Sequence, residues 1–339
     1  MKITHVLILY CVTLSMIVVD RIGRSHAFEA KPVDRVEVSL SATRETELAP
    51  HGEGNVYAPD LIVDDSGLYR MWYGGQGRDG RDRIHYAESR DGIGWRKFGV
   101  VVDDQTANHV NDPSVVRFHR EFYMYYTRAE SDVVDEIDLA TSTDGISWKK
   151  RGVALKPGPP GSWDSLLVGR PSVIIENERL TMWYDGRKDL PPEAPAKNAP
   201  KSADSHRSVG RATSTDGIHW VKEPAGAVLG SDIGGIDVKR LGNHYLMVYE
   251  RHDGIGAAIS HDGIGWIDRG IFVRRSGTAI DRHGDVTPFL LAPRADRGFE
   301  LFAGAARAES WDRNTIVRIK IDRGRIDDLF DNAPRSHNK

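Results

Sequence analysis

Residues 141–148 read TSTDGISW, and three close copies of this octapeptide occur elsewhere in the chain. The copies are ESRDGIGW at 88–95, TSTDGIHW at 213–220 and ISHDGIGW at 259–266. Asp-Gly is a strong hairpin signal, because a tight primed turn needs positive φ, which Gly adopts freely and Asp tolerates. The repeat predicts antiparallel meanders, and a large tryptophan ring after each turn can fill the space between neighbouring sheets. We interpret the motif as a turn and packing device rather than as a chemical site.

An apolar hairpin precedes each copy, and a fifth hairpin lacks the Asp-Gly-Trp turn. The five hairpins cover 59–75, 112–127, 170–186, 237–250 and 285–304. Five units of about fifty residues, each with up to four short strands, are typical of a propeller rather than a sandwich. The sequence therefore predicts an all-β fold, a five-bladed β-propeller.

The ends of the chain predict how the ring closes. The last unit has strand patterns at 286–291, 299–303 and 316–321 but no clear fourth strand. The segment VDRVEVSL at 33–40 reads as a strand without a neighbour in sequence. We expect it to complete the fifth blade, because such an exchange removes exposed sheet edges.

The N-terminus reads as a signal peptide. Lys2 and His5 precede an apolar run, 6–19, that is too short to span a bilayer, and Ser25-His26-Ala27 offers small residues for cleavage. We expect residues 1–27 to be removed, which leaves 28–339 as a single propeller domain. The mature protein is then secreted or periplasmic and has no membrane association. The only cysteine, Cys11, lies in the leader, so the mature chain has no disulfide.

The composition excludes some partners. The chain is 28% charged with a net charge of −3, and its Lys and Arg residues are scattered, so we expect no nucleic-acid partner. We expect a monomer. The segment 190–208, rich in Pro, Ala and Lys, interrupts the third unit, and we expect it to be a mobile surface loop or, alternatively, a lid.

Aligning the five units gathers polar residues at one face of the predicted ring. The inner strands begin at Asp60, Asp112, Arg170, Asp237 and Asp285, and the second strands end at Gly74, Thr127, Asp185, Glu250 and Gly304. Because these starts and ends meet, up to six carboxylates and one arginine converge on one funnel, and such crowding raises some pKa values. Paired carboxylates are the groups that cleave glycosides. For each single Asp, the alternative is a role in ordering the adjacent turn.

Aromatic residues lie at the same strand ends. They are Trp72, Tyr73, Tyr126, Trp183, Tyr184 and Tyr249. These rings are candidates for stacking on sugars, although strand alternation buries about half of such residues between blades. We expect no required cofactor; a structural calcium ion on the axis is compatible with a ring of acids.

Two motifs carry a family resemblance. YAPD ends at Asp60 and NDPSVV contains Asp112. Together with the five-unit plan and the S-x-D-G-x-x-W turns, they resemble the five-bladed β-propeller glycosidase superfamily, which includes arabinanase and β-xylosidase, invertase and levansucrase, and mannoside-phosphorylase types. The resemblance covers essentially the mature chain. It implies a base Asp, matched by Asp60, and a supporting Asp, matched by Asp112.

The general-acid Glu of that family has no match at the expected place. The third unit reads GRPSV, with Arg170 where several members carry Glu. We therefore assign the acid to Glu250, with Asp237 and Asp285 as rivals. Arg170 suggests recognition of a carboxylate or phosphate through its planar fork, or else a salt bridge to Asp112 or Asp237.

Three functions follow. The first is an exported glycoside hydrolase that acts on a poly- or oligosaccharide, with Asp60 as base, Asp112 as the supporting residue, Glu250 as acid and inversion as the expected outcome. The second is a non-catalytic carbohydrate-binding propeller. The third is a glycoside phosphorylase in which Arg170 holds phosphate.

Overall fold

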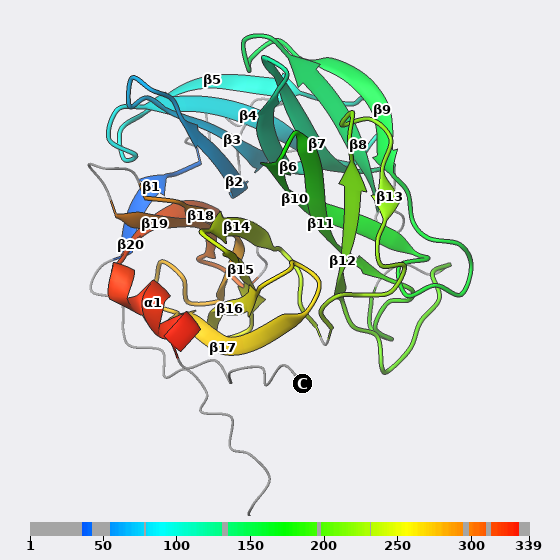
Figure 1. Cartoon of the computed structure of the whole chain (residues 1–339). Helices are drawn as coiled ribbons and strands as arrows, with labels where there is room; N and C mark the ends of the chain where they lie inside the picture. The colour runs from blue at the N-terminus through cyan, green and yellow to red at the C-terminus, as the bar shows by residue number, and fades with distance from the viewer. Residues whose placement is uncertain are drawn as a thin grey trace, which may run out of the picture.

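The computed structural model consists of five four-stranded antiparallel sheets arranged in a ring, which confirms the predicted five-bladed propeller (Figure 1). The structure describes residues 36–42, 55–77, 79–130, 135–194, 198–230, 232–293, 298–309 and 313–331. The expected leader, residues 1–27, and Cys11 lie outside these ranges. Of the helices in the described ranges, none is both long and apolar enough to cross a membrane.

Each blade is one meander numbered from the axis outward. Blade 1 contains β2 (Asn55–Val63), β3 (Tyr69–Gln76), β4 (Asp82–Ser89) and β5 (Trp95–Val102). Blade 2 contains β6 (His109–Phe118), β7 (Glu121–Ala129), β8 (Asp135–Ser142) and β9 (Lys149–Leu155). Blade 3 contains β10 (Leu167–Glu176), β11 (Arg179–Arg187), β12 (Ser208–Ser214) and β13 (Val221–Lys222). Blade 4 contains β14 (Asp237–Leu241), β15 (His244–Arg251), β16 (Gly254–Ser260) and β17 (Trp266–Arg274).

The last blade joins both ends of the described chain. It contains β18 (Gly284–Leu291), β19 (Phe299–Ala306), β20 (Asn314–Ile321) and, on the outside, β1 (Val36–Leu40). The N-terminal strand pairs antiparallel with β20, with Val36 opposite Ile319 and Val38 opposite Val317 (Figure 1). Residues 33–35 of the expected strand lie outside the described ranges.

The repeated octapeptide forms the same turn in four blades. In blade 2, Ser142 Oγ accepts the Gly145 N–H, and Asp144 Oδ1 accepts the N–H groups of Ile146 and Ser147 at 2.8 and 2.7 Å. The corresponding glycines have φ between 73° and 80°, so Gly supplies the left-handed residue while Asp acts through its carboxylate. These hydrogen bonds lower the pKa of Asp144 to about 2. The motif is a turn device, as expected.

The turns also connect neighbouring blades. Trp72 of blade 1 donates its indole N–H to the Gly145 carbonyl of blade 2 at 2.8 Å. Trp183 of blade 3 does the same to Gly263 of blade 4 at 2.9 Å. Each apolar cluster lies between two adjacent blades, and the tryptophans that follow the Asp-Gly turns, Trp95, Trp148, Trp220 and Trp266, pack against these clusters. A buried indole satisfies its one donor in this way.

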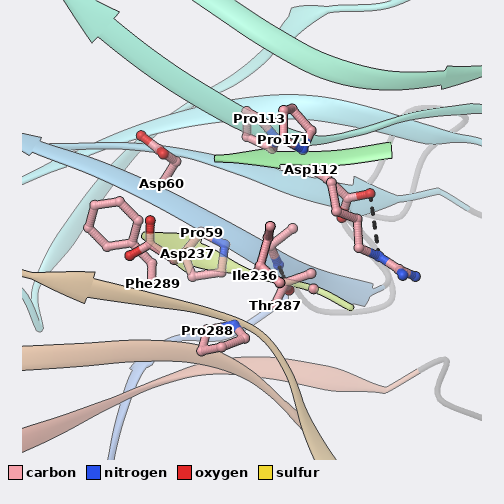
Figure 2. Close-up of a pocket in the computed structure, with 13 residues that line it drawn as sticks. Pro59, Asp60, Asp112, Pro113, Pro171, Ile236, Asp237, Thr287, Pro288 and Phe289 are labelled. Carbon is pink, nitrogen blue, oxygen red and sulfur yellow. Dashed lines mark hydrogen bonds and ion pairs between the residues drawn. The ribbon is translucent and has the colours of Figure 1, made fainter. Parts of the chain in front are cut away.

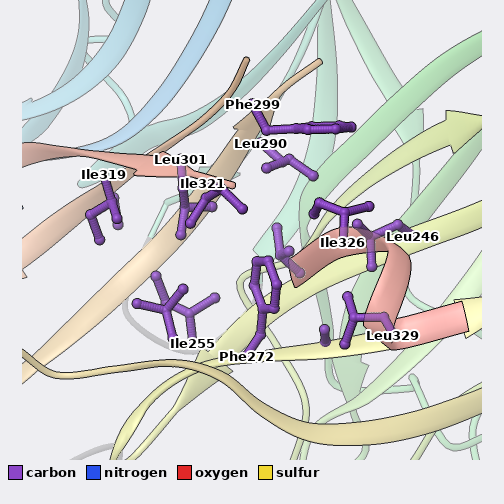
Figure 3. Close-up of a cluster of buried hydrophobic side chains, with 14 of the residues drawn as sticks. Leu246, Ile255, Phe272, Leu290, Phe299, Leu301, Ile319, Ile321, Ile326 and Leu329 are labelled. Atoms are coloured by element: carbon purple, nitrogen blue, oxygen red, sulfur yellow. The ribbon is translucent and has the colours of Figure 1, made fainter. Parts of the chain in front are cut away.

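A C-terminal helix that the sequence analysis did not predict covers one of these clusters. Helix α1 (Arg323–Asp331) buries Ile326 and Leu329 against Phe272 and its neighbours in blades 4 and 5 (Figure 3). The Arg325 guanidinium donates to the Phe272 carbonyl at 3.0 Å. The helix therefore covers apolar surface where the outer part of blade 4 meets blade 5.

The insertion of blade 3 is anchored in its described parts. Leu190 and Ala199 form a small cluster with Leu166, which directly precedes β10. Leu190 also exchanges backbone hydrogen bonds with Pro200 and Ser202. Residues 195–197 lie outside the described ranges. The described segments are thus packed on the blade, which favours a fixed surface loop over a lid.

Candidate active site at the propeller axis

The same irregularity begins the innermost strand of every blade. In blades 1, 2, 3 and 5 a β-bulge shifts the register of the first two strands, and the first unpaired residue of the bulge has positive φ. The equivalent residue of blade 4 lies just before β14 and has positive φ as well, and the five values lie between 43° and 56°. These residues are Ala58, Asp112, Arg170, Gly235 and Thr287. In four blades the next residue is proline. Positive φ at non-glycine residues stores strain, and such residues cluster at functional sites.

The bulge creates two levels of side chains around the axis. Asp112 and Arg170 lie at the bulge, whereas Asp60 and Asp237 lie two residues further along their strands, at the level of Ser114 and Ser172. Figure 2 shows the two levels: Asp60, Asp237 and Phe289 lie at one end of the pocket and Asp112 at the other, with prolines between them. The expected alignment of Asp60 with Asp112 is therefore wrong by two residues.

The deeper level links neighbouring inner strands. Ser172 Oγ accepts the Val238 N–H at 2.9 Å, and Asp237 Oδ2 accepts the Leu290 N–H at 2.8 Å. Asp60 accepts the backbone N–H of Val115 in the same way. These contacts hold successive blades together where the ring is narrowest.

Asp60 lines an axial cavity of about 30 Å³, which has room for a water molecule but not for a sugar. Its Oδ1 is buried and has no hydrogen-bond partner among the described residues. Burial and the nearby charge of Asp237 together raise the pKa of Asp60 to about 8, while Lys239 opposes the shift. Asp60, the expected catalytic base, therefore lines a cavity too small for a sugar, and its raised pKa favours the protonated form at pH 7.

The bulge level opens into a larger cavity of about 310 Å³ at the mouth of the axis. Its wall is formed by Asn55, Tyr57, Gln76, Asn111, Asp112, Arg170, Glu250, Val286, Thr287 and Asn314. Amide and phenol groups dominate this wall, and they suit a ligand with many hydroxyl groups because they both donate and accept hydrogen bonds.

Asp112 and Arg170 face each other in this cavity. Arg170 Nε lies 3.9 Å from Asp112 Oδ2, and Arg170 Nη1 donates to Asp185 Oδ2 at 2.9 Å. Burial raises the pKa of Asp112 to about 6, and the Arg170 charge holds it below the value that burial alone would give. The negative charges of Asp185 and Glu250 push it upward. Asp112 therefore titrates near neutral pH, which suits a general acid.

Glu250 provides the second carboxylate of the mouth cavity. Glu250 Oε1 accepts the Thr287 N–H at 2.9 Å, and its Oε2 lies 3.6 Å from Arg207 Nη1. Blade 4 carries Gly234 and Gly235 at this point, and a Cβ on Gly235 would overlap the Glu250 carboxylate. Gly235 therefore makes room for Glu250, whereas Gly234 makes room for Asp185 and Arg207. Blade 4 is the position in the ring where no bulge side chain competes with Glu250.

Replacing Gly235 by Ala is expected to lower any activity that depends on Glu250 by at least about tenfold, because the new Cβ displaces the carboxylate and a shift of about 1 Å costs roughly 10²-fold. Gly242→Ala is the matched control, since Gly242 has a similar φ of 63° and open space around it. Comparison of turnover and urea midpoints separates displacement from backbone strain. Equal loss in both variants would contradict this role for Gly235.

A second network supports the rim of the cavity. Asn111 Nδ2 lies 3.3 Å from the Tyr57 hydroxyl and 3.4 Å from Asp82 Oδ2, and the same Asp82 oxygen contacts His109 Nδ1. Burial and the Asp82 charge raise the pKa of Tyr57 well above its usual value. The phenol is therefore held neutral at the wall beside Asp112.

The structure separates the remaining predicted residues from the mouth cavity. Asp185 is buried and bonds Arg170 and the Gly235 N–H, so it positions Arg170. Asp237 is buried at the deeper level and is paired with Lys239 at 2.8 Å. Asp285 lies on neither cavity wall; it occupies the position where the other blades have Val or Ile, and burial raises its pKa to about 7. From the predicted funnel of carboxylates we expect these three to contact the substrate; none of them lines the mouth cavity, and the contact stays a prediction.

The aromatic rings that were expected to stack on a sugar are buried between the blades. Trp72, Tyr73 and Tyr184 have at most 1% of their surface exposed, and Tyr126, Trp183 and Tyr249 are buried as well. The alternation of the second strands turns these rings into the clusters between blades, where they present no face to a sugar. Tyr57, which the sequence analysis did not single out, is the aromatic residue that lines the mouth cavity.

The axial acids do not suit a divalent cation. Asp237 already pairs with Lys239, and within the described ranges no three His, Cys, Asp or Glu side chains are arranged to hold a metal ion. The structural calcium ion stays a prediction without support from the side chains described.

A repeated dipeptide in the sequence marks several site residues. Aligning the five units on their carboxylates did not make use of it. The dipeptides Ala58-Pro59, Asp112-Pro113, Arg170-Pro171 and Thr287-Pro288 mark equivalent positions. Alignment on proline would have separated Asp60 from Asp112 and drawn attention to Tyr57 and Asn111, the residues before the bulge. Arg207 had no such signal, because it follows an insertion.

Comparison with known proteins supports the fold. No family model matches the chain. An uncharacterised protein of Mycobacterium tuberculosis is 33% identical over 138 residues, which covers 37% of this chain and 44% of that protein. A 1,2-beta-oligomannan phosphorylase of Thermoanaerobacter sp. is 27% identical over 154 residues, which covers 38% of this chain and 52% of that enzyme. The alignments thus span about half the length of these relatives.

Solved structures resemble nearly the whole described fold. A glycoside hydrolase superposes with a TM-score of 0.65 at 16% identity, covering 84% of this chain and 92% of that one. A family 117 glycoside hydrolase of Zobellia galactanivorans superposes with a TM-score of 0.64 at 15% identity, covering 89% and 98%. The fold is therefore that of the five-bladed propellers found in glycoside hydrolases, as the sequence motifs suggested.

Proposed function

We propose that this protein cleaves glycosidic bonds by acid and base catalysis, with Asp112 and Glu250 as the two carboxyl groups. The observation that carries the proposal is that both residues lie on the wall of one open cavity whose other side chains are mostly amides and a phenol. Strained backbone at Asp112 and Arg170 supports a functional site at this level. The similarity to glycoside hydrolases and to a phosphorylase is consistent with this chemistry.

The roles follow from the surroundings of each group. Asp112, with a pKa of about 6, is protonated often enough near neutral pH to donate a proton to the leaving oxygen. Glu250 accepts a backbone N–H and faces Arg207, contacts that suit a carboxylate acting as base. We propose a hydrolase that inverts the anomeric centre, because both groups line a cavity of about 310 Å³, a volume that can admit a sugar together with a water. The expected leader makes export part of the proposal.

The test is product release from a panel of oligosaccharides, followed by NMR of the first anomer formed. Hydrolysis with inversion is the expected result. Release of the retained anomer would overturn the assignment of Glu250 as base, and binding without any product would favour a non-catalytic carbohydrate-binding propeller.

Phosphorolysis is a second candidate. It is favoured by Arg170 in the mouth cavity and by partial identity to a protein named as an oligomannan phosphorylase. Turnover that requires inorganic phosphate and yields a sugar phosphate would assign the protein to this reaction, whereas phosphate-independent release supports the hydrolase.

Replacing Arg170 by Met is expected to raise the pKa of Asp112, because removal of a cation 3.9 Å away disfavours the carboxylate. If Asp112 must be protonated, the basic limb of the kcat/KM profile moves to higher pH by about one unit. Arg179→Met is the control, because Arg179 pairs with Glu223 at the far end of β11. An unchanged basic limb, with activity still measurable, would contradict Asp112 as the acid.

A further inference from the structure

Arg170 lines the mouth cavity, and two more arginines, Arg187 and Arg207, lie near enough to it to interact electrostatically. Arg170 lies at the bulge of β10, Arg187 ends β11, and Arg207 directly precedes β12. The Arg207 carbonyl accepts the N–H groups of Asp232 and Ile233 at 2.9 and 3.3 Å, which anchors the end of the insertion beside blade 4. The Arg207 side chain packs against Gly234, so that its guanidinium reaches Glu250.

The three guanidinium groups are not equally compensated. Arg170 donates to Asp185 at 2.9 Å. Arg207 reaches Glu250 only at 3.6 Å, longer than a hydrogen bond. The Arg187 Nε is buried and has no hydrogen-bond partner among the described residues. A buried donor without a partner is costly, so the Arg187 and Arg207 guanidinium groups are less fully compensated than that of Arg170.

The surrounding charges also leave these guanidinium groups without full compensation. Burial lowers the pKa of Arg187, and the positive charges of Arg207 and Arg170 lower it further. Asp185 and Asp232 oppose the shift but do not cancel it. Asp135, on β8, faces the same group of arginines, and burial raises the pKa of its carboxyl. An oxyanion between Arg187 and Arg207 would compensate both guanidinium groups.

We propose that Arg187 and Arg207 form an oxyanion-binding subsite at the edge of the mouth cavity, which selects substrates that carry an acidic sugar unit. This inference rests on the proposed function, because it names the substrate class of the same site. The planar fork of each guanidinium matches a carboxylate or a sulfate ester in two-point contact. The subsite lies toward blade 4, beside Glu250, so it recognises an acidic group near the cleaved bond while Asp112 acts on the bond itself.

The experiment measures binding without turnover. Calorimetry on the Asp112→Asn protein compares matched pairs of oligosaccharides that differ only in a hexuronic acid or its neutral hexose, in the gluco, galacto and manno series. We expect at least one acidic member to bind about tenfold more tightly than its neutral partner, since charge-assisted hydrogen bonds are stronger than neutral ones. This preference should fall below about threefold in Arg187→Gln and Arg207→Gln proteins, and it should persist in Arg179→Gln.

Three outcomes separate the alternatives. Equal affinity within every pair, or an acidic preference that survives both substitutions, overturns the subsite. Tight binding of inorganic phosphate that is lost in both variants, with no preference among sugars, supports the subsite but assigns the oxyanion to free phosphate. Cleavage of neutral oligosaccharides by the wild-type protein with no acidic preference leaves the proposed function standing and overturns this inference alone.

Discussion

Replacing Asp112 by Asn is expected to lower kcat/KM for glycoside cleavage by about 10²–10⁴-fold, and Glu250→Gln by a similar factor, because each removes a proton-transfer group from the transition state. Both residues lie on the mouth cavity wall, and each substitution keeps the size of the side chain. Initial rates on the best substrate of the panel measure the effect. Because the two groups act in one step, the double variant should lose far less than the product of the two single losses.

Asp60→Asn is the comparison variant, because it changes a carboxyl at the deeper level of the axis rather than one on the wall of the mouth cavity. Asp60 lies below the mouth cavity, so the variant should retain most of the wild-type kcat near neutral pH. Circular dichroism and urea midpoints show whether each variant is folded. Full activity in Asp112→Asn, or loss in Asp60→Asn comparable to that in Asp112→Asn, would return the base to the position that the sequence motif first suggested.

The second large effect is on the free energy of unfolding, which Asp60 lowers as the pH rises. A salt-bridged acid has the opposite pH dependence. The folded-state pKa of Asp60 is about 8, above its unfolded value of 3.8, because burial disfavours the charged form. The folded state therefore binds more protons between these values, and the free energy of unfolding falls as pH rises, at up to about 1.4 kcal/mol per pH unit from this group. Asn keeps the neutral form at all pH values, so Asp60→Asn should gain stability relative to the wild type as pH rises from 5 to 8.

Urea unfolding of both proteins at pH 5, 6.5 and 8 measures this difference directly. Asp285 and Asp112, whose pKa values burial raises to about 7 and about 6, contribute to the slope of both proteins, and the subtraction removes them. Asp64→Asn is the control, because Asp64 is a loop residue whose hydrogen bonds to Ser66 and Leu68 lower its pKa. Equal slopes for the wild type and Asp60→Asn would show that Asp60 is ionised in the folded protein.

The sequence predicted the second strands of the blades better than the first strands. Thr127, Asp185 and Glu250 are equivalent, because each accepts a backbone N–H from the bulge residue of the next blade. The first strands were aligned on their carboxylates, which placed Asp60, Asp112 and Asp285 at one level. The bulge shifts the register, so Asp60 lies two residues after the bulge and Asp285 two residues before it.

The functional residues that the sequence analysis missed depend on contacts between units. Tyr57 and Asn111 are held by Asp82, which lies on the third strand of blade 1 and carries no motif. Arg207 reaches Glu250 because the insertion folds back onto blade 4. No local pattern encodes such distances, since they follow from how neighbouring sheets are twisted and packed.

The fold itself is specified by short-range chemistry. The Ser-x-Asp-Gly turns close through hydrogen bonds within a few residues, and alternating apolar residues give each strand a buried face, so the number of blades can be read directly from the chain. The depth of a side chain on the axis cannot be read in this way. A single left-handed residue per blade moves Asp60 away from solvent and leaves Asp112 in the cavity, and burial in a low-dielectric interior then makes the first a neutral structural group and the second a candidate acid.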